Sequence, residues 1–198
     1  MELKREHLWD KINRQATYFF AKKNVNRIKP FVTRNDRVLD IGSGYGKQAF
    51  TLQEAIGCSV SAIDVVDYNR FDIPFKEFDG VHVPFEDEAF DVSYLAFVLH
   101  HAEKPIELLK EALRVTKRTL LIFEDTPRNA FDRTLDGFHG RSFNWYYKLS
   151  NPAVFRTQKE WEKIFSEIPL QTRESIPLSR FWREPYFPIS RTLFVLKK

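Results

Sequence analysis

The sequence is short of cysteine and glycine and has no long apolar run, and each shortage excludes a class of protein. One of its 198 residues is cysteine, so an intramolecular disulfide cannot form, and chemistry that needs several thiols is excluded. No stretch approaches the roughly 20 apolar residues that a membrane span requires. The charged residues at the N-terminus do not resemble a signal peptide. We therefore expect a cytoplasmic protein, with Cys58 buried as a small apolar side chain.

The chain does contain enough apolar material for one globular domain. Hydrophobic residues make up 43% of it, and the net charge is a modest +4. The positive excess is concentrated in residues 1–29, which hold eight Lys and Arg against three acidic residues. Such a segment can attract nucleic acid or anionic substrates, but a solvated basic face of a helix is the simpler interpretation.

The hydrophobic pattern alternates between short β-branched runs and longer stretches with helical spacing. Strands are predicted at 37–41, 58–64, 75–80, 90–99, 118–125, 170–178 and 190–197, and helices at 47–56, 105–115 and 157–165, with a basic helix ending before Pro30. The alternation over 37–125 predicts right-handed crossovers and an α/β fold with a doubly wound, parallel sheet. Residues 126–156 break this alternation.

Three of the seven glycines, Gly42, Gly44 and Gly46, follow the first predicted strand. Glycine lets backbone amides approach a ligand, and open α/β sheets bind ligands beyond the carboxyl ends of their strands. A dinucleotide-binding turn would need glycine at position 47, which is Lys47, and the sequence lacks the Gly-Lys-Ser/Thr of a phosphate-binding loop. A tight turn without any ligand is the structural alternative.

Two acidic residues flank this turn in the predicted sheet. Asp40 precedes the glycines, and its charge favours a cationic ligand over a pyrophosphate. Asp64 ends the second strand, where a carboxylate can accept hydrogen bonds from both hydroxyls of a ribose. The pair therefore indicates a nucleoside derivative with positive charge. S-adenosylmethionine (SAM), which combines a ribose, an adenine and a sulfonium, fits this description.

Four stretches carry a resemblance to a known family: "VLDIGSGYG", "AIDV", "FDGVHVPFEDEAFDVSYLAFVLHHAEKPIELLKEALRV" and "LLIFED". They resemble the successive motifs of class I SAM-dependent methyltransferases, in particular the type 11 group with its quinone-biosynthesis-like members. The resemblance covers about residues 35–125. It implies a Rossmann-like, seven-stranded, mostly parallel sheet with helices on both faces and an antiparallel C-terminal hairpin. The sequence departs from the family at 116–119, where "TKRT" replaces a frequent Lys-Pro-Gly-Gly turn.

The resemblance also implies which residues contact SAM and its demethylated product, S-adenosylhomocysteine (SAH). The implied residues are Asp40, Gly42, Ser43, Gly44 and Gly46 for the amino-acid part, Asp64 and Val65 for the ribose and adenine face, Asp79 and Gly80 for the adenine edge, and Ala96 for the methionine and sulfonium.

Methyl transfer needs the acceptor held in line with the methyl group, and a base where the acceptor must lose a proton. The candidates on the substrate side are His100 and His101 after the fourth strand, Glu124 and Asp125 after the fifth, and His139 in the variable segment. Each has a structural alternative, because a histidine can bond to the backbone and the acids can cap the following turn. The two acids and Asn129 form an incomplete set of oxygen ligands, so we expect no metal.

We expect a SAM-dependent methyltransferase with a small, aromatic or amphiphilic acceptor, because aromatic-lined pockets bind flat apolar molecules and the later part of the chain is rich in aromatic residues. An RNA or protein acceptor docked on the basic N-terminal helix is less favoured, and a catalytically silent SAM-binding regulatory module is the third hypothesis. The expected organisation is one domain over 1–198, with a basic helical cap (1–29), a SAM-binding core (30–125), a substrate-side insertion (126–156) and a C-terminal helix and hairpin (157–198).

Overall fold

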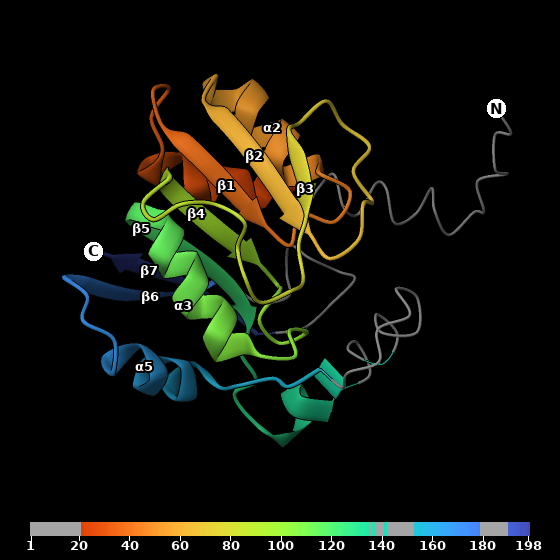
Figure 1. The fold of residues 1–198 in the computed structure, drawn as a ribbon. Helices are drawn as coiled ribbons and strands as arrows, with labels where there is room; N and C mark the ends of the chain where they lie inside the picture. The colour runs from red at the N-terminus through yellow and green to blue at the C-terminus, as the bar shows by residue number, and fades with distance from the viewer. Residues whose placement is uncertain (1–20, 135, 138–140, 142–152, 179–189) are drawn as a thin grey trace, which may run out of the picture.

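A single mixed sheet forms the centre of the molecule (Figure 1). The computed structural model describes residues 21–134, 136–137, 141, 153–178 and 190–198. The strand order is β3-β2-β1-β4-β5-β7-β6. The strands are β1 (Arg37–Ile41), β2 (Ser59–Asp64), β3 (Phe75–Glu77), β4 (Phe90–Ala96), β5 (Thr116–Asp125), β6 (Thr172–Leu178) and β7 (Arg191–Lys197). Strands β1 to β5 pair in parallel, and β7 pairs antiparallel with β5 and β6.

The helices begin and end where the sequence offers the appropriate residues. Helix α2 (Lys47–Ile56) lies between Gly46 and Gly57, both with φ of 76°, and a left-handed residue at a helix end favours glycine. Helix α3 (Pro105–Val115) begins with proline in its first turn. Helix α5 (Gln158–Ser166) follows Thr157, which forms a reciprocal capping box with Glu160.

The N-terminal part of the described chain is helical over 21–28 and continues into a short 3-10 helix, η1 (Lys29–Phe31). These residues are the described part of the predicted basic helix, and the remainder of that prediction, over 1–20, lies outside the described residues. In the part of the chain that the structure describes, no helix is long and apolar enough to cross a membrane.

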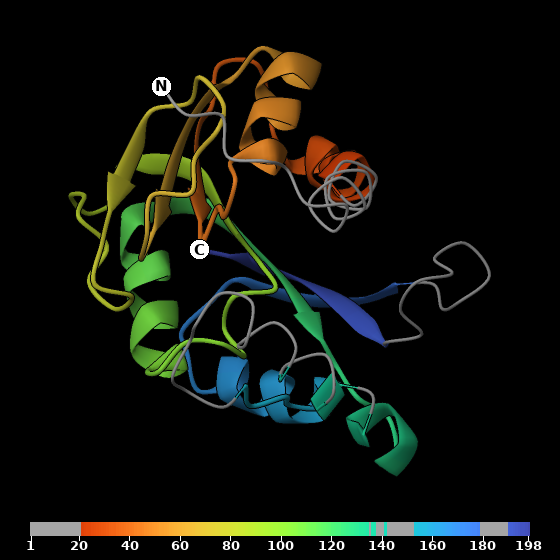
Figure 2. The ribbon, with the colours of Figure 1, turned by 90° about the vertical axis from the view of Figure 1, so that its right-hand side faces the viewer.

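Helices cover both faces of the sheet and bury a separate apolar layer on each (Figure 2). Leu39 on β1 belongs to the layer under α3 and α5, together with Trp161 of α5. Its neighbour Val38 belongs to the opposite layer, with Val25 of the N-terminal helix and Leu52 of α2. Successive side chains of a strand point to opposite faces, so the continuous apolar runs of the central strands supply both layers.

Helix α3 leads directly into β5 without an intervening loop. The Thr116 hydroxyl donates to the Ala112 carbonyl at 2.6 Å and also shares a hydrogen bond of 2.8 Å with the Ser93 hydroxyl, which fixes the change from helix to strand. The departure of "TKRT" from the family turn therefore shortens this connection. Cys58 is buried, as expected.

The predicted fold class is confirmed: a seven-stranded, doubly wound, mostly parallel sheet with an antiparallel C-terminal pair and helices on both faces. The strand order reverses between β1 and β4, because the chain winds outward from β1 through β2 to β3 and then returns to β4. Ligands of open α/β sheets bind at such a switch point. It lies at the carboxyl ends of β1 and β4, where the glycine turn begins.

Candidate functional site

The glycine turn after β1 is held by the carboxyl end of β2. The amides of Gly42 and Ser43 donate to the Ile63 carbonyl at 2.8 and 3.1 Å. The Gly44 amide donates to Oδ2 of Asp64 at 2.7 Å. Backbone groups at the end of β1 thus meet the one acidic side chain that ends β2, which brings together two features that the sequence places 20 residues apart.

All three glycines of the turn have positive φ, but their surroundings differ. A Cβ on Gly42 would lie 2.5 Å from Cγ2 of Val98, so this glycine is required for close packing against the segment after β4. A Cβ on Gly46 would lie 2.3 Å from Oδ1 of Asn69. A Cβ on Gly44 would meet no atom within 4 Å. Gly44 therefore faces open space in the direction of its missing side chain, while its amide is bonded to Asp64.

Asp40 lies under the turn rather than in the open. Its side chain is buried on the α2 side of the sheet, near Ala49 and Tyr94, and burial raises its pKa to about 7 although Tyr94 opposes this. Among the described residues, Oδ2 of Asp40 and the buried hydroxyl of Ser43 have no hydrogen-bond partner. Two polar atoms at the base of the turn are thus available to a ligand or to water.

Asp64 accepts backbone amides on both carboxylate oxygens and has an exposed apolar neighbour, Val65. Its Oδ1 accepts the Val65 amide at 2.7 Å. Burial raises the pKa of Asp64, although the amides of Gly44, Val65 and Val66 oppose this. Val65 is 44% exposed, and a Cβ on Gly80 would lie 3.2 Å from its Cγ1. Gly80 and Val65 therefore form a narrow apolar surface beside the carboxylate.

Asp79, which the resemblance places at the adenine edge, is engaged within its own loop. Its carboxylate accepts the amides of Val81 and His82, at 2.8 and 2.7 Å, and pairs with Nδ1 of His82 at 2.6 Å. Hydrogen bonds from His82 lower the pKa of Asp79 to about 2. The side chain thus shapes the loop that carries Gly80, a function that the sequence did not reveal.

The chain leaves β4 through a residue with strained backbone. Phe97 directly follows Ala96 and has φ of 62°, an uncommon value for a residue with a Cβ. Its amide donates to the Phe123 carbonyl on β5 at 2.9 Å, and Arg191 lies 4.8 Å above its ring. The segment after β4 is thereby turned away from the strand direction and toward the end of β5.

His100 and Glu124, both predicted as candidates, form a buried pair. Nδ1 of His100 lies 2.6 Å from Oε2 of Glu124, and Oε1 of Glu124 accepts the Leu99 amide at 2.9 Å. Both side chains are at most 1% exposed. Burial alone would lower the pKa of His100, but the carboxylate of Glu124 raises it above its ordinary value. Phe155 stacks on the imidazole ring at 4.7 Å.

Of the other candidates, His101 and Asp125 lie within the described residues. His101 packs against His100 with ring centroids 4.2 Å apart, and Asp125 accepts Nε of Arg191 at 2.9 Å from within the buried end of β5. Glu124 bonds to Leu99 and His100 rather than to the segment after β5, and Asp125 is the last residue of β5. His139 lies outside the described residues.

Two further acids, absent from the predicted candidates, join this region from the segment after β5. Asp132 is buried and accepts Ser190 Oγ at 2.8 Å and the Arg128 amide at 3.1 Å. Asp136 is fully buried, and its burial together with Asp125 and Asp132 raises its pKa to about 7. The four-residue spacing of the two acids was the available signal, since it places them on one side of a helix.

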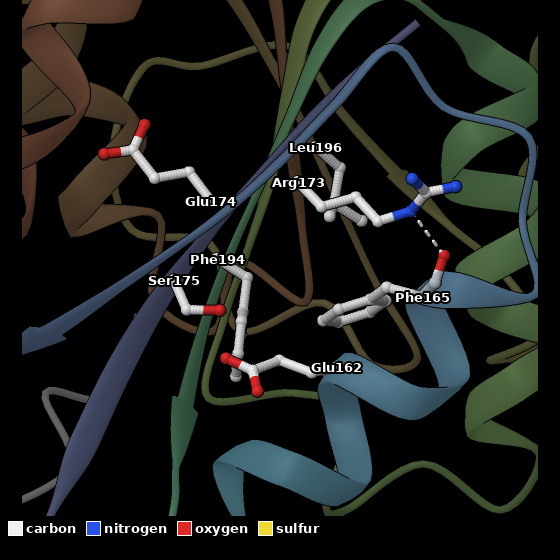
Figure 3. A pocket seen from close by; sticks show the side chains of 7 residues that line it. All are labelled: Glu162, Phe165, Arg173, Glu174, Ser175, Phe194 and Leu196. Atoms are coloured by element: carbon white, nitrogen blue, oxygen red, sulfur yellow. Dashed lines mark hydrogen bonds between the residues drawn. The ribbon is translucent and has the colours of Figure 1, made fainter.

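A cavity of about 230 Å³ lies elsewhere, between α5 and the β6–β7 hairpin (Figure 3). Nε of Arg173 donates to the Phe165 carbonyl at 2.7 Å and so joins β6 to the end of α5. The lining residues are Glu162, Phe165, Arg173, Glu174, Ser175, Phe194 and Leu196. None of them belongs to the glycine turn or to the carboxyl ends of β4 and β5, so this cavity is separate from the candidate site.

Residues 39–122 match the family model of a methyltransferase domain. This range contains the glycine turn, Asp64 and the end of β4. Residues 39–122 are thus similar to a methyltransferase domain. The fold is shared with a SAM-dependent methyltransferase from Archaeoglobus fulgidus, on which the chain superposes with a TM-score of 0.73 at 13% identity, over 97% of this chain and 100% of that one.

Two curated relatives extend the match along the sequence. The uncharacterized methyltransferase YcgJ of Bacillus subtilis is 30% identical over 146 residues, which cover 66% of this chain and 55% of that protein. A demethylmenaquinone methyltransferase of Paenarthrobacter aurescens is 34% identical over 87 residues, covering 41% of this chain and 34% of that protein. The chain therefore spans about half of the first relative and a third of the second.

SAM is the cofactor that the similarity to methyltransferase domains implies. Open space at Gly44, the exposed side chain of Val65 and the carboxylate of Asp64 lie together at the carboxyl ends of β1 and β2. A carboxylate oxygen can accept more than one hydrogen bond, so Asp64 retains capacity for ribose hydroxyls. Within the described ranges, no three His, Cys, Asp or Glu side chains are grouped so as to hold a metal ion.

Proposed function

We propose that this protein is a methyltransferase that binds SAM over the glycine turn and a small, aromatic or amphiphilic acceptor beyond the ends of β4 and β5. The observation that carries the proposal is the meeting of the Gly44 amide with the Asp64 carboxylate beside open space. We propose the expected domain organisation with it, so that residues 126–156 form the substrate side.

Each part of SAM has a proposed partner. Asp64 accepts hydrogen bonds from the ribose hydroxyls, and Val65 with Gly80 borders the adenine. Gly42, Ser43, Gly44 and Gly46, with Asp40 beneath them, hold the amino-acid part, and Ala96 lies beside the methionine. Asp79 acts on the adenine edge by fixing the loop around Gly80. When bound, SAM supplies a methyl group already activated by the sulfonium.

His100 is the proposed general base. When its Nδ1–H donates to Glu124, its Nε2 carries a lone pair, and among the described residues this buried Nε2 has no hydrogen-bond partner. The same arrangement of carboxylate and imidazole prepares a base in hydrolytic enzymes. Glu124 therefore sets the tautomer and orientation of His100. Asp125 and His101 pack around the pair as positioning residues.

An aromatic acceptor is supported by the ring that borders this base. Phe155 stacks on His100 with ring centroids 4.7 Å apart. Aromatic side chains favour offset or tilted contact with another flat ring. The similarity to a demethylmenaquinone methyltransferase supports the same class of flat acceptor.

The cofactor assignment is tested by calorimetry with SAM and SAH on the purified chain. We expect both to bind, and Asp64→Asn to weaken SAH binding by about 10- to 100-fold, because a hydrogen bond to a charged group contributes about 1.5–3 kcal/mol. Asp72→Asn, the same change at an exposed acid, is the matched control. Absence of binding to the folded protein, or equal affinity of the two variants, would contradict the assignment.

Turnover is tested with SAM that carries a deuterated methyl group and a panel of phenols, quinols and aromatic amines, with product detection by mass spectrometry. We expect methylation of at least one class and its loss in His100→Asn with SAH binding retained. Binding of SAM with no product across the panel would favour a regulatory module instead.

A further inference from the structure

Asp136 is a buried acid whose carboxylate has no hydrogen-bond partner in the described part of the chain. Its side chain has no solvent exposure, and among the described residues neither of its oxygens accepts a hydrogen bond. Burying a carboxylate without a partner is costly, so proteins usually pair such groups. Burial and the neighbouring acids raise the pKa of Asp136 to about 7, so a cationic group placed beside it would favour its ionised form.

The charged neighbours of Asp136 come from three other parts of the chain. They are Asp125 at the end of β5, Asp132 in its own helical segment, His100 after β4 and Arg191 at the start of β7. The two cations have carboxylate partners already: Arg191 pairs with Asp125 at 2.9 Å and His100 with Glu124 at 2.6 Å. Among the charged groups that the structure describes around Asp136, the acids therefore outnumber the cations.

A second, independent feature points to the same place. His100 is 1% exposed, and its Nε2 has no hydrogen-bond partner in the described part of the chain, although its charge interacts with those of Asp125 and Asp136. A buried imidazole nitrogen and a buried carboxylate that interact electrostatically thus both lack a hydrogen-bond partner in the described part of the chain.

We propose that Asp136 binds a cationic nitrogen of the methyl acceptor, so that the substrate is an aromatic or apolar amine. This inference rests on the proposed function and specifies the substrate class of the same site. Asp136 pairs with the ammonium group and Phe155 borders the apolar part, while His100 Nε2 faces the reacting end. A charge-assisted hydrogen bond of this kind is about twice as strong as a neutral one.

The test uses a matched pair of probes on the full chain, in the presence and absence of SAH. The probes are 2-phenylethylamine, which is an ammonium ion at pH 7, and 2-phenylethanol, which has the same shape without the charge. Calorimetry compares the unaltered protein with Asp136→Asn and with the exposed control Asp72→Asn. If Asp136→Asn does not fold, Asp136→Ser removes the same charge with a smaller side chain.

We expect the amine to bind about tenfold or more tightly than the alcohol in the unaltered and control proteins, and the preference to vanish in Asp136→Asn. Equal binding of the two probes, or a preference that survives the substitution, would overturn the inference. SAH binding is read separately. If SAH binds but the protein does not prefer the amine over the alcohol, the inference alone fails. If SAH does not bind, the proposed cofactor fails. In that case, a preference for the amine that depends on Asp136 would still support the subsite.

Discussion

Gly42 and Gly44 are two residues apart in one turn, yet the structure predicts opposite consequences for their replacement by alanine. Gly42 has φ of 77° and Gly44 has φ of 54°, so both substitutions place a Cβ in the left-handed region. That conformation costs roughly 1–2 kcal/mol for a residue with a Cβ. Only Gly42 also has a neighbour in the way, since its Cβ would lie 2.5 and 2.9 Å from the two methyl carbons of Val98.

The two costs combine differently at the two sites. Gly42→Ala adds overpacking to the backbone strain, and overpacking typically costs about 1–3 kcal/mol. We therefore expect Gly42→Ala to lower the free energy of unfolding by about 2–5 kcal/mol. Gly44→Ala carries the strain alone, about 1–2 kcal/mol. Its methyl group instead occupies the open space that we assign to SAM.

The assay is urea unfolding of each variant, followed by calorimetry with SAH. We expect Gly44→Ala to remain folded and lose SAH binding, whereas Gly42→Ala mainly loses stability. Val98→Ala in the Gly42→Ala background should restore part of the loss, because it removes the clashing methyl groups. A rescue of this kind appears as a coupling energy between contacting residues of about 0.5–3 kcal/mol.

Two results would refute this reasoning. If Gly44→Ala binds SAH as tightly as the unaltered protein, the open space beside Gly44 is not the cofactor site. If Val98→Ala gives no rescue, the loss at Gly42 does not arise from the contact with Val98.

Four further results are expected, two from the buried His100–Glu124 pair and two from α5. Glu124→Ala should lower the free energy of unfolding by about 3–5 kcal/mol, measured in urea, because it leaves a buried partner uncompensated; a loss below about 1 kcal/mol would contradict the buried pairing. The pKa of His100 is raised in the folded state, which contributes stability that is fully present below the unfolded pKa of about 6.5 and is lost as pH rises through the folded pKa. The difference in free energy of unfolding between the unaltered protein and His100→Asn should therefore shrink as pH rises. A difference that grows with pH would contradict this prediction. Trp161→Ala should cost about 3–5 kcal/mol in thermal or urea unfolding, since this fully buried ring joins α5 to the core. Thr157→Ala should cost about 0.5–2 kcal/mol through loss of the α5 cap, and less in a Glu160→Ala background.

The sheet could be predicted because its information is local. The alternation of apolar runs and helical spacing predicted the seven strands, α2, α3 and α5, and the helix ends followed from residues such as Gly57 and Pro105. The antiparallel hairpin came from the resemblance alone, because no local pattern in 170–197 distinguishes a parallel from an antiparallel partner.

The candidate site was predictable only in part. Glu124 and His100 could be named because parallel strands bring their carboxyl ends to one edge. That they form a hydrogen-bonded pair depends on the left-handed turn at Phe97, which no local rule predicts for a phenylalanine. Asp136 was missed, since a polar residue in an irregular segment looks solvent-exposed until the fold buries it.

The sequence by itself thus determined the order of elements, the glycine turn and the two acids that accompany it, because each depends on neighbouring residues and on backbone preferences. The tertiary structure decided which glycine packs and which faces open space, which acid is ionised and which histidine nitrogen is left unpaired. Those properties depend on burial and on contacts between segments such as β4, β5 and β7, and burial is what changes the energy of a charge or of an unpaired polar atom.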